Sequence, residues 1–220
     1  MNSTIDISMA LDYGRARTRL GLSLIPARGH EEMLAKVPYT AMEDLALIYK
    51  VEMGPVDSII ISNDMLDGYG ISFEELRDDA LYGVPKRHPC VIRSLASCLK
   101  DLADDTAAGE GEPDLFSCLD EDSVVPVLTA STADMFMGAC VIAYPGMLAK
   151  ASDMMGGDLY ILPSSVHEVL LVKAEGPDCR WLQEIVSEVN RTMVDRKDRL
   201  SDNVYYYDSR TGEFMTAAAL

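Results

Sequence analysis

Pairs of short β-rich runs, each joined by a tight turn, recur along this chain and constrain its fold more than any other feature. Runs of this kind that are separated by a few turn residues predict antiparallel hairpins. The pattern predicts hairpins over residues 44–64, 125–146, 159–172 and 203–215. A helix that follows a hairpin can cover one face of its sheet. The sequence therefore predicts an α+β fold in which helices following the antiparallel hairpins pack on one face.

Helix-start signals follow the first three hairpins. Ser72 and Glu75 form a capping box, and Ile71 is placed to pack against Leu76. Further helices are predicted over residues 94–103, from Pro145 to the Gly156-Gly157 pair, and after Asp178, which is a suitable N-cap. The apolar stripe of the last helix is predicted to be core: Trp181, Leu182, Ile185, Val186 and Val189.

A strongly acidic stretch divides the chain. Residues 104–122, DDTAAGEGEPDLFSCLDED, combine two glycines and a proline with a run of carboxylates, which is typical of an exposed loop. It separates an amino-terminal α+β part (residues 1–103) from a carboxy-terminal α+β part (residues 123–220). The sequence thus predicts two subdomains joined by an acidic loop.

The net charge of −17 argues against nucleic-acid binding, which needs Lys and Arg to replace phosphate counterions. It favours a non-catalytic interaction protein with a basic protein partner, such as an inhibitor that occupies the basic groove of a nucleic-acid enzyme in bacterial defence. Solubility alone is the plainer explanation of the charge. At least one ring of the tyrosine run 205–207 is also expected to be exposed. The candidate partner-binding residues are the carboxylates of the acidic loop and one of these tyrosines: Asp104, Asp105, Glu110, Glu112, Asp114, Asp120, Glu121, Asp122 and Tyr206.

The turn PSSVHE, residues 163–168, raises the alternative of a hydrolase. Ser165 and His167, with Asp202 as a third residue, are the candidate catalytic set. In an extended strand, however, residues two apart lie roughly 6.6 Å from one another, too far for direct proton transfer. The plainer interpretation is a hairpin turn in which the serines hydrogen-bond backbone groups.

Other catalytic and cofactor motifs receive little support. The matches Ser97–Lys100 (S-x-x-K), residues 201–203 (S-D-N) and residues 210–212 (RTG) imitate a penicillin-binding enzyme, but the last two lie too close together to face each other across a cleft. His88, Cys90 and Cys98 match no zinc spacing, and no phosphate-binding loop is present. No cofactor or metal is therefore predicted.

Five cysteines without a C-x-x-C pair predict free thiols in a reducing compartment. No apolar run approaches the roughly 20 residues of a membrane span. The amino terminus lacks the basic start and apolar stretch of a signal peptide. A cytoplasmic protein that does not contact membranes is expected.

Several motifs together resemble a domain-of-unknown-function family of anaerobic gut bacteria. They are DLALIYKV, YPGML, DLYILPSSVHEVLLV, EVNRT and LSDNVYYYD, and the resemblance covers roughly residues 6–214 apart from the acidic loop. Members usually carry an additional amino-terminal region, so the resemblance implies that this chain begins late. It implies a bacterial cytoplasmic origin, and it implies neither an activity nor a catalytic residue.

Overall fold

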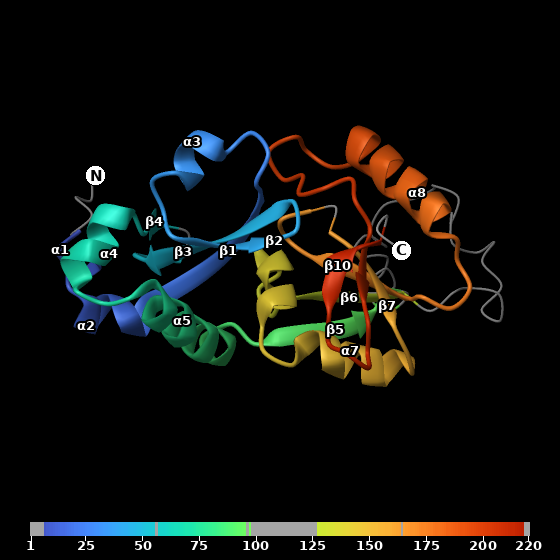
Figure 1. Ribbon diagram of the computed structural model, residues 1–220, viewed down its shortest axis with the longest axis horizontal. Helices are drawn as coiled ribbons and strands as arrows, with labels where there is room; N and C mark the ends of the chain where they lie inside the picture. Colours follow the sequence, from blue (N-terminus) through green and yellow to red (C-terminus); the bar gives the residue numbers. More distant parts are fainter. Residues whose placement is uncertain (1–6, 56, 96, 98–126, 164, 218–220) are drawn as a thin grey trace, which may run out of the picture.

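A computed structural model describes residues 7–55, 57–95, 97, 127–163 and 165–217. It contains helices together with two antiparallel sheets, which lie beside one another along the long axis of the molecule (Figure 1). The predicted α+β fold class is confirmed. No helix within these ranges is long and apolar enough to cross a membrane.

The first sheet is centred on β3 and includes the predicted hairpin at Gly54-Pro55. The strand order is β1-β3-β2, and β4 pairs with the end of β3. Since β3 is paired along its length and nearly all of it is buried, its apolar run LALIYKV is explained. The strands are β1 (Leu20–Pro26), β2 (Tyr39–Met42), β3 (Leu45–Glu52) and β4 (Ser58–Ile60).

The second sheet has the order β10-β9-β7-β8-β6-β5. The predicted hairpins β7–β8 and β9–β10 are both present as antiparallel pairs. The edge strand β5 belongs to this second sheet although it precedes the acidic stretch in the sequence. The chain therefore passes from the first sheet to the second before Cys90. The strands are β5 (Cys90–Ser94), β6 (Val127–Thr132), β7 (Leu159–Leu162), β8 (Val169–Lys173), β9 (Tyr205–Tyr207) and β10 (Phe214–Thr216).

The two longest helices begin at the predicted caps. The side chain of Ser72 accepts a hydrogen bond from Glu75 N, and that of Asp178 accepts one from Arg180 N. The helices are α1 (Ser8–Leu11), α2 (Tyr13–Ala16), η1 (Arg17–Arg19), α3 (Glu31–Leu34), α4 (Asn63–Tyr69), α5 (Phe73–Arg87), η2 (Gly138–Ala143), α7 (Met147–Met155) and α8 (Cys179–Thr192). Of the helix predicted over residues 94–103, Ser94 instead ends β5, Leu95 and Ser97 are helical, and residues 96 and 98–103 lie outside the described residues.

The hairpin predicted over residues 125–146 is wrong. Its first run is β6, but its second run is the buried 3-10 helix η2. Both edges of β6 already pair with other strands, β5 and β8, so no edge is left for a hairpin partner. The backbone also leaves the extended conformation at Met135 and Met137, which both have positive φ.

Two helix predictions also need correction. Helix α7 begins at Met147, with Gly146 rather than a residue before Pro145 as its N-cap. On α8, Leu182 and Val186 are buried as predicted, but Trp181 is 54% exposed and Ile185 is 38% exposed. The predicted stripe is wider than the row of side chains that α8 buries.

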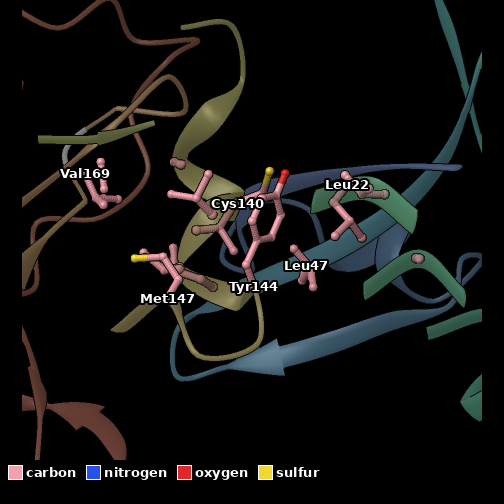
Figure 2. Packing of buried hydrophobic residues seen from close by; sticks show 14 of the residues in the cluster. Leu22, Leu47, Cys140, Tyr144, Met147 and Val169 are labelled. Atoms are coloured by element: carbon pink, nitrogen blue, oxygen red, sulfur yellow. The ribbon is translucent and has the colours of Figure 1, made fainter. Parts of the chain in front are cut away.

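One hydrophobic core extends through both sheets, with η2 between them (Figure 1). Figure 2 shows Cys140 and Tyr144 of this segment between Leu22 and Leu47 of the first sheet and Met147 on the other side. Because η2 fills the space between the sheets, each sheet buries its inner face partly against the same helix.

Polar contacts also connect the sheets. Asp44, in the turn between β2 and β3, accepts hydrogen bonds from the hydroxyls of Ser201 and Tyr205. The neighbouring Glu43 accepts one from Thr216 at 2.7 Å. The tip of the first sheet is thereby fixed to the end of the second.

Candidate functional site

A pocket of about 320 Å³, here called the junction pocket, opens where the first sheet, β6 and η2 meet. Its walls carry charged side chains of both signs beside apolar ones. Such a concave site with converging polar groups is the usual form of a small-molecule site. The lining residues are Leu22, Lys50, Glu52, Gly54, Pro55, Asp57, Ser58, Val84, His88, Thr132, Asp134, Phe136, Met137, Cys140 and Tyr144.

Strand β3 supplies two charged groups to the pocket. Lys50 and Glu52 are two residues apart, so they lie on the same face of the strand. Glu52 Oε1 lies 2.9 Å from His88 Nε2, and its Oε2 lies 3.9 Å from Arg87 Nε. Lys50, by contrast, forms no ion pair with any of the described residues, so its ammonium group is available to a ligand.

The opposite wall supplies an ionised carboxylate. Asp134 accepts a hydrogen bond from the Thr132 hydroxyl at 2.7 Å and a longer one from Phe136 N at 3.4 Å. The Thr132 hydrogen bond lowers the pKa of Asp134, and the hydrogen bond from Phe136 N contributes in the same direction. Asp134 therefore stays charged well below neutral pH.

The loop that carries Asp134 is strained. Met135 and Met137 have φ of 53° and 54°, values that β-carbon sterics disfavour. Such conformations cost on the order of 1–3 kcal/mol each and cluster at binding and active sites. The loop approaches its neighbours so closely at Gly138 that a Cβ there would lie 2.1 Å from Ser131 Oγ.

The PSSVHE turn holds this loop in place. Met137 N donates to His167 Nδ1 at 3.3 Å, and Ala139 N donates to Val166 O at 3.1 Å. Because Nδ1 accepts, a neutral His167 carries its proton on Nε2, which lies 3.7 Å from Asp198 Oδ1. The histidine thus acts as a positioning residue for the pocket loop.

The candidate catalytic set is only partly brought together. Ser165 Oγ accepts a hydrogen bond from His167 N at 3.1 Å, so the serine contacts the backbone of the histidine. Asp202 Oδ1 accepts from Asn190 Nδ2 at 2.6 Å, and the carboxylate paired with the His167 ring belongs to Asp198 instead. The geometry matches that of a turn stabilised by serine hydrogen bonds.

The pocket also contains a thiol and a phenol. Burial raises the pKa of Cys140 to about 11 and that of Tyr144 further above its ordinary value. The Tyr144 hydroxyl donates a hydrogen bond to His88 O at 3.1 Å. Both groups remain protonated at neutral pH, so the thiol is a poor nucleophile.

The other candidate residues lie elsewhere. The eight carboxylates of residues 104–122 lie outside the described residues. Tyr206 is partly buried rather than exposed, and Tyr205 and Tyr207 on either side are buried, which corrects the expected exposure. Its hydroxyl donates to Asp158. Within the described ranges no group of three His, Cys, Asp or Glu could hold a metal, and Cys98 lies outside them.

Sequence reasoning missed Lys50, Glu52 and Asp134. The signal for the first two was present, because charged residues at alternate positions of an otherwise apolar strand point to one shared polar site. Asp134 could not be found in this way, since its position depends on the strained loop.

Comparisons with known proteins give a family but no activity. Neither the curated proteins nor the solved structures contain a match to this chain. One family model, described as "Family of unknown function (DUF5688)", matches residues 1–209, almost the full length. The chain therefore belongs to the DUF5688 family.

Proposed function

We propose that this protein is a non-catalytic binding protein of the bacterial cytoplasm that holds a small zwitterionic molecule in the junction pocket. The observation that carries the proposal is the pairing of an ammonium group that has no ion-pair partner among the described residues with an ionised carboxylate in the same pocket. Lys50 attracts the anionic group of the ligand, and Asp134 attracts its cationic group. The lining holds two further carboxylates, Asp57 and Glu52, and Glu52 is paired with His88.

The size and rigidity of the pocket support this proposal. Its volume of about 320 Å³ suits a molecule of amino-acid size. The loop that bears Asp134 accepts a hydrogen bond from β6 and donates one to the PSSVHE turn, so little ordering entropy is lost on binding.

The reactive side chains near the pocket support a binding role over a catalytic one. The Cys140 thiol is held in its protonated form, and the Ser165 hydroxyl is occupied by a backbone N–H. A nucleophile is activated by a general base within hydrogen-bond reach of its proton or by a lowered pKa. These two groups are better suited to shaping the site than to attacking a substrate.

The test is calorimetric titration of the purified chain with the free amino acids. Monofunctional amines and carboxylic acids of the same size serve as comparison ligands. We expect one or more amino acids to bind, and Lys50→Met to weaken that binding at least about tenfold, as expected for a lost charge-assisted contact. Lys197→Met, which removes the same charge from an exposed position outside the pocket, is the matched control. Equal binding by both variants, or equal binding of a monofunctional analogue, would refute the proposal.

We propose as a second function that the acidity serves contact with a basic protein partner, including inhibition of a nucleic-acid enzyme. The supporting observation is the net charge of −17, with eight carboxylates concentrated in residues 104–122. Association should then weaken steeply with salt, since ions screen charges beyond about 8 Å at physiological strength. Changing those carboxylates to Asn and Gln should slow association more than it accelerates dissociation, and an affinity independent of salt would contradict this function.

A further inference from the structure

A second open groove lies at the carboxyl end of α8. It shares no lining residue with the junction pocket. It has a volume of about 640 Å³. The loop between β1 and α3 forms one wall, and the last turn of α8 with the segment after it forms the other. Its polar lining includes Arg28, Arg191, Arg196, Arg199, Asn190 and Asp202, and we call it the arginine groove.

The charge of this groove is opposite to that of the molecule. Four of the chain's 19 basic residues line it, in a protein of net charge −17. Arg199 Nε donates to Val194 O at 2.9 Å, and Arg191 pairs with Glu188 at 2.6 Å, so both have structural partners. Arg28 and Arg196 are exposed and have no hydrogen-bond or ion-pair partner among the described residues. Their guanidinium groups are therefore available to an anion.

An unsatisfied buried amide in the same groove gives a second, independent indication of a ligand. Asn190 is only 2% exposed. Its Nδ2 donates to Ser201 O at 3.0 Å and to Asp202 Oδ1 at 2.6 Å. Because both neighbours are acceptors, the amide cannot be reversed, and Oδ1 is the atom left without a partner. A buried acceptor of this kind calls for a donor, such as a hydroxyl group.

We propose that the arginine groove binds a small phosphate monoester that carries a hydroxyl group, as sugar phosphates do. Arg28 and Arg196 donate in forked geometry to the phosphate oxygens. Asn190 Oδ1 is enclosed in the free protein, so the amide shifts toward the groove to accept the hydrogen bond that the ligand hydroxyl donates. The negative charge of the rest of the molecule selects a small anion over a nucleic acid, because each phosphate beyond the groove meets repulsion. This site is separate from the junction pocket, and the proposal does not depend on the pocket's ligand.

The experiment is calorimetric titration of the full chain with glucose 6-phosphate, inorganic phosphate and glucose. We expect glucose 6-phosphate to bind more tightly than inorganic phosphate, and glucose not to bind. Arg28→Gln and Arg196→Gln should each weaken glucose 6-phosphate binding about tenfold or more. Arg180→Gln, on the first turn of α8 and outside the groove, should leave it unchanged.

Three results would overturn the proposal. One is binding of glucose 6-phosphate that both groove variants retain, and another is no binding by the unaltered chain. The third is tighter, strongly salt-dependent binding of a single-stranded RNA oligonucleotide that glucose 6-phosphate does not displace. Circular dichroism of the variants checks that they fold, which is expected because both arginine side chains are exposed.

Discussion

The contact between Asp44 and Tyr205 should be a strong coupling between the two sheets. Tyr205 is completely buried, and its hydroxyl donates to Asp44 Oδ1, whereas Asp44 Oδ2 accepts from Ser201 Oγ at 2.8 Å. Hydrogen bonds to a charged group contribute about 1.5–3 kcal/mol each. We therefore expect Tyr205→Phe to lower the free energy of unfolding by about 1.5–3 kcal/mol. Asp44→Ala, which removes both acceptors and leaves a buried phenol unpaired, should lower it by about 3–5 kcal/mol.

The measurement is a double-mutant cycle in urea. The coupling free energy between Asp44→Ala and Tyr205→Phe should be about 2 kcal/mol, since the double variant loses their shared hydrogen bond only once. Tyr207→Phe is the matched control, because this tyrosine lies on the same strand, is also buried, and makes no hydroxyl hydrogen bond with a described residue. Effects that add within about 0.5 kcal/mol would show that the contact does not connect the sheets energetically.

Four further predictions concern single residues. In chemical denaturation, Gly138→Ala should destabilise the protein by about 3 kcal/mol or more, because its Cβ would lie 2.6 Å from the backbone nitrogen of Thr132. Gly68→Ala is the control: its Cβ would enter open space, so it should be neutral or stabilising. Cys140, with its pKa raised to about 11, should react with iodoacetamide at pH 8 on the order of 100-fold more slowly than a free thiol, and a normal rate would contradict its burial. Hydrogen bonds from the hydroxyls of Ser209 and Tyr206 lower the pKa of Asp158 to about 2. The ionised carboxylate should therefore stabilise the fold by less than about 1 kcal/mol above pH 4, and this stabilisation should disappear as the pH falls to about 2. Acid titrations of Asp158→Asn should lack it. His167→Ala should cost about 1–2 kcal/mol in thermal or chemical unfolding, and loss of a hydrolase activity in this variant would instead support a catalytic turn.

The local signals in the sequence were sufficient for much of the fold. Capping by Ser72 and Asp178 depends on residues within one turn of the helix, and the hairpins depend on turns of a few residues. The second run of the predicted 125–146 hairpin failed for a non-local reason. An apolar run such as GACVIA forms a strand only if a neighbouring strand has an unpaired edge. Both edges of β6 are already paired, one with β5 and the other with β8.

The candidate site was harder to predict than the fold. The sequence singled out Ser165 and His167 as a candidate catalytic pair, but Ser165 contacts the backbone and His167 supports a loop 30 residues away. Lys50 and Asp134 converge only after two sheets and a strained loop are assembled. Proximity of this kind is a property of the tertiary structure and has no local sequence signature.

The position of η2 has a consequence for how the chain matures on the ribosome. The strands of the first sheet end at Ile60, but the helix that covers part of their inner face begins at Gly138. A nascent chain therefore presents the apolar side chains of Leu22 and Leu47 for the time needed to add that segment, which is several seconds at about 5–20 residues per second. During this interval the exposed apolar face of the first sheet could bind a chaperone. Slower translation of the intervening residues would lengthen the time during which this face can aggregate.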